Sequence, residues 1–333
     1  MDQIANIAIG GFFIVAAMIF FLLVVEVNKF KKGKKKIEAE SKNVPFYPKK
    51  DFGAVTTLEI LPLCEWYTSG NNLQGAAGVS YLIRTDKGNI LFDVGVNGSS
   101  KKDLSPLLYN MKQLGVTVND FDSIVISHNH MDHVGGSKWM MRKTFSLGNE
   151  QIDLSSKAVY TPIPMTYPAL NPICCNEPTV IATGIATIGT IQNWAFIEGR
   201  LLEQALAINI AGKGIVLIVG CGHQTVSKIL ERTESLFAEP LYGIIGGLHY
   251  PVADSRVKVM GIELQKYLGT CRLPWVKITK NEVMENIECL KKYHPKVVAL
   301  SAHDSCDVSI DMFHKAFPDA YREVRVGENI NFK

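Results

Sequence analysis

The sequence of 333 residues predicts a body of layered β-sheets and α-helices, preceded by one membrane-spanning helix. Two patterns predict the α/β body: short aliphatic runs of strand length come first, and helices alternate with strands in the second half. The spanning helix is predicted by a long uncharged apolar run near the N-terminus. We therefore divide the chain into a transmembrane anchor (1–28), a basic linker (29–50) and one folded body (51–333).

The apolar run covers residues 4–25 and contains no charged side chain. Its 22 residues, at about 1.5 Å each, can cross a hydrocarbon core of roughly 30 Å. A signal peptide would need positive charge before the run, whereas the chain begins Met1-Asp2-Gln3 and six lysines lie between residues 29 and 36. Lysines beside a spanning helix stay on the cytoplasmic side. We expect a single-pass protein of the cell membrane with its body facing the cytoplasm.

The formal charge of +3 is unevenly distributed along the chain. Residues 1–50 contain nine lysines and four acidic residues, whereas residues 51–333 contain 26 basic and 28 acidic side chains. The body therefore lacks the positive charge that nucleic-acid binding requires, and we expect no nucleic-acid partner. Seven scattered cysteines without a Cys-x-x-Cys pair indicate free thiols in a reducing compartment.

The elements of the body follow from local composition and spacing. Runs of β-branched and aliphatic residues predict strands at residues 55–61, 79–84, 90–93 and 121–126. A tight turn at 211–214 predicts a hairpin of strands 205–210 and 215–219. Helical spacing predicts helices at 104–114, 225–237, 280–293 and 310–317. Residues 137–200 show no clear period, and we expect this segment to shape the mouth of a pocket.

The strongest functional signal is Ser127-His128-Asn129-His130-Met131-Asp132-His133-Val134-Gly135-Gly136, directly after an apolar run. On an extended chain, His128 and His130 project to the same side and can hold one metal ion as a pair. Asp132 and His133 follow where the chain turns and can reach a second ion. A single histidine usually packs in a core, but four metal-capable side chains within six residues favour a metal site.

The remaining histidines reinforce this prediction. His223, His249 and His303 each follow a predicted strand, and the C-terminal ends of neighbouring strands converge at one edge of a sheet. His294 and His314 fall on or beside predicted helices, and we expect them at the surface. The sequence therefore predicts one metal centre assembled from distant segments.

Two motifs resemble those of the metallo-β-lactamase-fold hydrolase superfamily: Phe92-Asp93-Val94-Gly95 and residues 128–133. The resemblance covers most of residues 55–330 and implies a four-layer αββα sandwich. The order of further motifs is similar to one branch, labelled 7,8-dihydropterin-6-methyl-4-(β-D-ribofuranosyl)aminobenzene-5′-phosphate synthase-like. These motifs are Glu203-Gln204-Ala205-Leu206, Gly220-Cys221-Gly222-His223, Gly246-Gly247-Leu248-His249 and Ser301-Ala302-His303.

The resemblance implies two metal sites. The first would be held by His128, His130 and, as our choice for its third ligand, His223. The second would be held by Asp132, His133 and His303. Asp93 would orient the ligand imidazoles through their free N–H groups.

Two residues are left with alternative roles. Cys221 stands where many superfamily members place a metal-bridging Asp; it is either a thiolate ligand, which favours zinc, or a packed side chain. His249 either faces the site or supports its turn.

These expectations imply two divalent metal ions, zinc or alternatively manganese or iron, that activate a hydroxide. Asp132 would hold this nucleophile and accept its proton. We expect a membrane-anchored hydrolase of a small-molecule ester, thioester, lactone or phosphodiester. A pterin/ribosyl-aminobenzene phosphate synthase of methanopterin-type biosynthesis ranks second, because a membrane anchor is unexpected for soluble substrates. A non-enzymatic metal or ligand sensor ranks third, because the ligand set is complete. The sequence does not define the oligomeric state.

Overall fold

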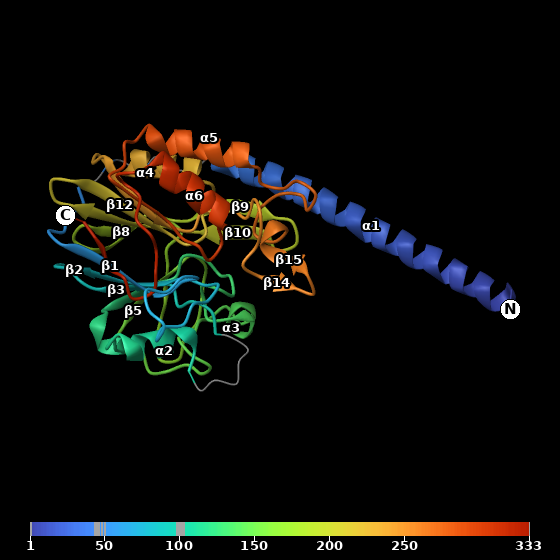
Figure 1. The fold of residues 1–333 in the computed structure, drawn as a ribbon, viewed down its shortest axis with the longest axis horizontal. Helices are drawn as coiled ribbons and strands as arrows, with labels where there is room; N and C mark the ends of the chain where they lie inside the picture. Colours follow the sequence, from blue (N-terminus) through green and yellow to red (C-terminus); the bar gives the residue numbers. More distant parts are fainter. Residues whose placement is uncertain (1, 43–46, 48, 50, 98–103, 333) are drawn as a thin grey trace.

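The computed structural model describes residues 2–42, 47, 49, 51–97 and 104–332 (Figure 1). Two β-sheets are stacked face to face, helices cover both outer faces, and one long helix projects from the body (Figure 1). This is the four-layer αββα sandwich that the resemblance implies. The first half of the body forms one sheet with its helices, and most of the second half forms the other.

The first sheet has seven strands, of which the early ones pair antiparallel and β3 to β6 pair in parallel. In spatial order they are β17 (Ile330–Asn331), β1 (Leu58–Cys64), β2 (Ser80–Thr85), β3 (Ile90–Phe92), β4 (Ser123–Val125), β5 (Ala158–Thr161) and β6 (Ile173–Cys174). Helices α2 (Pro106–Gln113) and α3 (Ser137–Met141) cover its outer face through a core that includes Leu107, Met111 and Trp139.

The second sheet has six strands. In spatial order they are β16 (Val297–Leu300), β13 (Leu241–Gly246), β12 (Gly214–Val219), β11 (Leu206–Ile210), β8 (Ile185–Thr187) and β7 (Thr179–Ala182). Its outer face is covered by α4 (Val226–Leu236), α5 (Lys280–Lys291) and α6 (Asp307–Ala316) (Figure 1). Strands β12, β13 and β16 run in parallel, so their C-terminal ends meet at one edge.

Strand β12 illustrates how the sequence produces these layers. Its side chains alternate between the two faces of the sheet, as the period of two requires. Ile215, Leu217 and Val219 pack against the helices, whereas Val216 and Ile218 pack between the two sheets. Because both faces are buried, the strand is apolar throughout.

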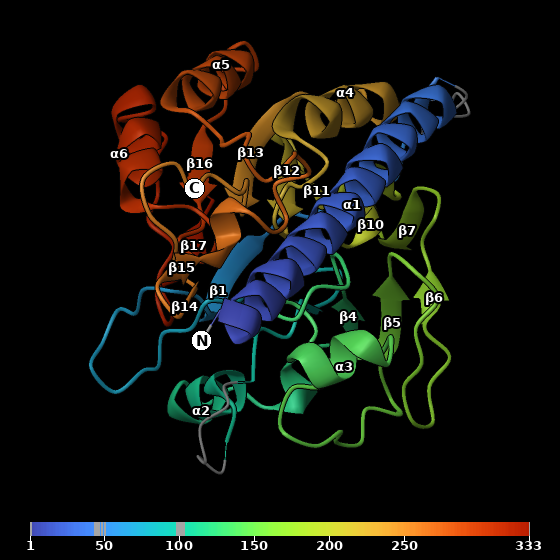
Figure 2. The same ribbon diagram turned by 90° about the vertical axis from the view of Figure 1, so that its right-hand side faces the viewer.

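Two hairpins lie on the side of the body from which the long helix α1 (Asp2–Ser41) projects (Figures 1 and 2). They are β9 (Ile191–Ala195) with β10 (Gly199–Glu203), and β14 (Lys258–Val259) with β15 (Ile262–Glu263). Single turns of 3₁₀-helix occur at Val118–Asp120 and Leu264–Lys266.

Helix α1 is long and apolar enough to cross a membrane, by length and composition. Its apolar side chains between Phe13 and Val24 are exposed. Residues 29–41, which we assigned to the basic linker, continue this helix without a break. Lysine, glutamate and alanine are good helix formers, and the segment packs on β9 and β10 through buried Phe30 and Ile37. Residues 43–46, 48 and 50 of the expected linker lie outside the described residues.

Most predicted elements match observed ones, with shifts at their ends. Strand β1 begins at Leu58 instead of residue 55, because Val55 makes an isolated bridge to Ile210 and Asp86 caps the next two N–H groups. The hairpin at the 211–214 turn is confirmed. The segment 137–200 holds one five-residue helix, five strands of two to five residues and the start of β10, all too short for a visible period.

Candidate metal centre

The predicted ligands converge at the C-terminal ends of strands from both sheets. Strand β4 leads into the histidine motif, β12 into Cys221 and His223, and β16 into His303. The antiparallel bridge between His128 and Glu203 joins the motif to strand β10. The edge predicted from sequence is therefore where the structure assembles these side chains.

The first group of potential metal ligands comprises His128, His130 and His223. One ligand atom from each lies within 4.8 Å of the others. His128 and His223 are buried, and His128 Nε2 and both ring nitrogens of His223 have no hydrogen-bond partner among the described residues. Buried polar atoms rarely stay unpaired, so these nitrogens fit a metal ion that they would share.

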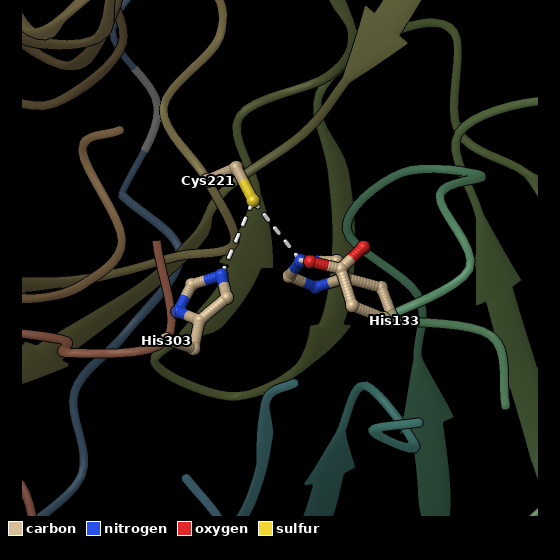
Figure 3. Close-up of side chains that lie close together, drawn as sticks. His133, Cys221 and His303 are labelled. Atoms are coloured by element: carbon tan, nitrogen blue, oxygen red, sulfur yellow. Dashed lines mark hydrogen bonds and ion pairs between the residues drawn. The ribbon is translucent and has the colours of Figure 1, made fainter. Parts of the chain in front are cut away.

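The second group comprises Asp132, His133, Cys221 and His303, again with ligand atoms within 4.8 Å of one another. Cys221 Sγ lies between the two imidazoles, 3.1 Å from His133 Nε2 and 3.2 Å from His303 Nε2 (Figure 3). Asp132 Oδ2 lies 3.6 Å from His133 Nε2. A carboxylate, a thiol and two imidazoles make a donor set that suits a divalent transition metal.

Cys221 connects the two groups. It also lies within 4.8 Å of ligand atoms of His223 and His249. The structure thus places the sulfur where both proposed sites can reach it. His249 faces the same space, but its Nε2 lies 3.0 Å from the carbonyl oxygen of Gln265, which also fits the predicted supporting role.

Asp93 contacts one potential ligand, His133, directly. It follows β3 in a left-handed backbone conformation with φ of 57°, and its Oδ2 lies 2.7 Å from His133 Nδ1. Ser127 donates to Asp93 Oδ2 at 2.6 Å, and its Oγ lies 2.9 Å from His128 Nδ1. Asp93 and Ser127 thus hold the His133 and His128 rings through Nδ1, so that Nε2 of each ring faces the centre.

Three glutamates near the centre, two buried and one exposed, were not assigned a role from the sequence. Glu203 accepts hydrogen bonds from the backbone N–H groups of Cys221, Gly222 and His223 at 2.8–2.9 Å. It therefore fixes the loop that carries two potential ligands. Glu203 appears in a motif of the resemblance, but nothing in its local sequence indicates this contact.

The other two glutamates support one histidine each. Glu65 accepts a hydrogen bond from Ser301, whose Oγ lies 2.6 Å from His303 Nδ1. Glu198, in the turn between β9 and β10, places its Oε2 3.3 Å from His130 Nε2. Burial raises the pKa of both Glu65 and Glu203 to about 7.

Carboxylates near the centre shift the pKa values of potential ligands. Burial raises the pKa of the Cys221 thiol well above its usual range, and the carboxylates of Asp132 and Asp304 raise it further. Burial lowers the pKa of His133, but Asp132 and Asp93 outweigh this effect and raise it to about 9. A concentration of negative charge around imidazoles and a thiol is the environment that favours a divalent cation.

A cavity of about 310 Å³ opens onto the centre. Its polar wall includes Asp132, Cys221 and His223, and its remaining wall is largely apolar. The apolar lining comes from Ala77, Val96, Met131, Val257, Leu264 and Leu268. The space accommodates a small molecule beside the potential ligands.

The seven cysteines, all among the described residues, are free. Cys306 is buried with its Sγ 3.5 Å from Ser309 Oγ, and His294 and His314 are exposed. The exposure of the two histidines agrees with the sequence-based expectation.

Comparisons with known proteins agree with the fold and the histidine motif. A family model described as the metallo-β-lactamase superfamily matches residues 74–145. A relative from Methanocaldococcus jannaschii is 26% identical over 269 residues, which cover 67% of this chain and 88% of the relative. That relative is named 7,8-dihydropterin-6-methyl-4-(β-D-ribofuranosyl)-aminobenzene-5′-phosphate synthase, the label of the branch that the motifs resemble.

Solved structures with the same fold extend over the body. Tm1679, described as a metal-dependent hydrolase of the β-lactamase superfamily, is 17% identical with a TM-score of 0.54 and covers 83% of this chain and 99% of its own. The metallo-β-lactamase fold protein YhfI from Bacillus subtilis is 13% identical with a TM-score of 0.50. The match covers 83% of this chain and 100% of YhfI. The family match therefore includes the histidine motif, and the body has the metallo-β-lactamase fold.

Proposed function

We propose that this protein is a metal-dependent hydrolase anchored to the membrane by helix α1, with a small-molecule ester, thioester, lactone or phosphodiester as substrate. One observation carries the proposal: two ligand groups, joined through Cys221, face one cavity at the strand ends. The donors include imidazoles and a thiol, which suit zinc better than harder cations.

In this proposal, His128, His130 and His223 would hold one ion, and Asp132, His133, Cys221 and His303 the other. When bound, such a pair lowers the pKa of a shared water and polarises a substrate oxygen. Asp132 is half-buried at the cavity, so its carboxylate orients the attacking water and takes up its proton.

A second candidate is the synthase activity of the relative from Methanocaldococcus jannaschii, supported by the identity of 26%. The same metal centre would then bind a pterin and a ribosyl-aminobenzene phosphate. The largely apolar cavity and the exposed apolar helix favour the hydrolase.

The membrane anchor is part of the proposal. Helix α1 exposes its apolar side chains from Phe13 to Val24, and the lysines follow immediately. Exposed apolar surface of this size requires an apolar environment. The lysines support a cytoplasmic position for the body.

A hydrolysis panel tests the proposed activity. The full-length protein is stripped of metal, reloaded with zinc, manganese or iron, and assayed on chromogenic carboxylic esters, thioesters, lactones and phosphodiesters. We expect zinc-dependent turnover of at least one class, and a loss of about 100-fold or more in Asp132→Ala. Asp153→Ala, an exposed carboxylate, is the matched control. Condensation of the pterin and ribosyl-aminobenzene phosphate substrates without hydrolysis would establish the second candidate instead.

A further inference from the structure

The body meets helix α1 at the point where the apolar run ends. Val25 and Val27 are already half-buried, and Phe30 is buried against the β9–β10 hairpin. At about 1.5 Å per residue, Phe30 lies only about 7 Å beyond Val25 along the helix axis. Each headgroup layer of a bilayer has a similar depth. The part of the body that touches Phe30 therefore lies at the membrane surface.

The turn between β9 and β10 links this contact to the metal centre. Phe196 packs on Phe30 with ring centroids 5.9 Å apart. The next residue, Ile197, is 69% exposed, and Glu198 then reaches His130 at 3.3 Å. Phe196 thus contacts helix α1, Ile197 projects outwards, and Glu198 contacts the potential metal ligand His130.

The β14–β15 hairpin lies on the same side of the body, close to where α1 projects (Figures 1 and 2). Its strands and turn expose three large apolar side chains: Val259 at 50%, Met260 at 97% and Ile262 at 56%. Trp275 is also exposed, and its ring lies 6.4 Å from that of Phe196. Lys277 adds positive charge to this face, which suits anionic headgroups, whereas Lys258 is paired with Glu263 at 3.6 Å.

The same hairpin forms part of the cavity wall. Val257 precedes β14, Leu264 follows β15, and both line the cavity. Gln265 fixes the base of the hairpin to the centre, because its side chain donates to the His303 carbonyl oxygen at 2.7 Å. An apolar surface therefore extends from the exposed tip of the hairpin into the cavity.

We infer that this face, defined by Ile197, Val259, Met260, Ile262 and Trp275, inserts into the membrane interface and that the cavity takes its substrate from the bilayer. The substrate class is an amphiphile whose apolar chain lies against Val257, Leu264 and Leu268 while its scissile ester or phosphodiester reaches the metal centre. This inference rests on the proposed hydrolase and its anchor. We assign the exposed apolar face to contact with lipid because the apolar part of helix α1 ends beside that face.

Fluorescence quenching tests the insertion independently of activity. Full-length protein is reconstituted in vesicles of phosphatidylcholine with a minority of phosphatidylglycerol, with and without bromine on the acyl chains. We expect bromine to quench the tryptophan emission, and Trp275→Phe to remove most of the quenching. Val259→Asp and Met260→Asp reduce it.

Val180→Asp is the matched control. Val180 is a strand valine of similar exposure, 59%, and it lines a cavity with Tyr47, beyond the C-terminal end of α1. That end lies about 24 Å from Val25 along the helix. No bromine-dependent quenching in the wild type, or equal quenching in Val259→Asp, overturns the inference. If the quenching disappears only when the protein is diluted, the face mediates contacts between copies of the chain. That result also overturns the inference.

Paired substrates test the substrate class. A long-chain and a short-chain version of each hydrolysed chromogenic compound are assayed with the vesicle-bound protein. We expect the long-chain version to be preferred, and Val259→Asp to lower its kcat/KM about tenfold while leaving the short-chain value and Val180→Asp unchanged. Preference for the short chain overturns the substrate class. Absence of any turnover contradicts the proposed hydrolase, and the quenching result still decides where the face lies.

Discussion

At the scale of single residues, Cys221 is the side chain on which the character of the centre depends. Its sulfur lies within about 3 Å of two imidazoles and is also shared with the first ligand group. In the absence of a cation, burial and nearby carboxylates keep it protonated. A metal ion would reverse this balance, because a coordinating thiol is deprotonated. The same cysteine could therefore be inert without metal and anionic with it.

Replacing this sulfur tests its role. Cys221→Ser substitutes a harder and weaker donor, so we expect zinc affinity to fall by about 100-fold or more. Competition with a chromophoric chelator measures that affinity. Cys306→Ser is the matched control, because Cys306 is equally buried outside the ligand groups. Unchanged affinity in Cys221→Ser would assign the residue to packing.

Glu203 gives a second prediction at this scale. Its carboxylate accepts three backbone N–H groups of the loop that carries Cys221 and His223. Glu203→Gln replaces one acceptor oxygen by an NH₂ group, and a buried donor then faces another donor. We expect a loss of about 1–3 kcal/mol in the free energy of unfolding and a 10–100-fold loss of metal affinity. Denaturant unfolding and chelator competition measure both.

The exposed Glu231→Gln on α4 provides the control for this substitution. A Glu203→Gln protein as stable as this control, with full metal affinity, would show that the loop holds its shape without the carboxylate.

The ligands could be predicted because their pattern is local or recurs at strand ends. His128, His130, Asp132 and His133 lie within six residues, and that density is readable without a structure. Glu65, Glu198 and Glu203 could not be assigned in this way. Acidic residues are common, and each of these contacts joins segments that only the fold brings together.

At the scale of elements, helix α1 differs most from expectation, because it is both the apolar segment and part of the body. Gly33 permits this contact: a Cβ there would lie 2.1 Å from Trp194 Cδ2. The next residue, Lys34, donates to Asn193 Oδ1 at 2.6 Å, and Asn193 donates to the His223 carbonyl oxygen at 2.5 Å. The anchor is thereby connected to the ligand loop.

A methyl group at this glycine should separate the helix from the hairpin. We expect Gly33→Ala to weaken the contact by about 1–3 kcal/mol, because the Trp194 ring leaves no room. Trypsin should then cut the lysine segment of vesicle-bound protein about tenfold faster. Gly11→Ala, in the same helix with no atom within 4 Å of the added carbon, is the control. Equal cleavage rates in the two variants would contradict the packing.

The elements that were predicted well have a clear hydrophobic period or a composition typical of their secondary structure. Strand β12 and helix α5, with its Thr279 capping box, are examples. Residues 29–41 were predicted as a linker but continue helix α1. The lysine-rich end of the helix is stabilised by packing on β9, and no local sequence pattern reveals that contact. The strands between residues 158 and 203 are two to five residues long, so tertiary pairing determines them.

At the scale of the whole molecule, the fold and helix α1 together predict how the body is oriented relative to a membrane. The apolar part of α1, the β9–β10 turn and the β14–β15 hairpin lie on one side of the body (Figures 1 and 2). Val257 and Leu264, which flank that hairpin, line the cavity. The proposed active site therefore lies on the side of the body from which the proposed membrane anchor extends.

The lysines between residues 29 and 36 predict which side of the membrane carries the body. In inverted membrane vesicles, whose cytoplasmic face is outside, trypsin should digest the body. In right-side-out vesicles the body should stay protected until detergent is added. Digestion in right-side-out vesicles alone would place the body on the opposite side.

Metal stoichiometry of the full-length protein and its variants is the most direct test of the central claim. Elemental analysis after purification should find two divalent ions per chain, zinc when zinc is supplied. Asp132→Ala and His223→Ala should each lose one of the two, because they belong to different ligand groups. Asp153→Ala should retain both. A wild-type protein that takes up no metal under saturating supply, or variants that keep both ions, would contradict the account.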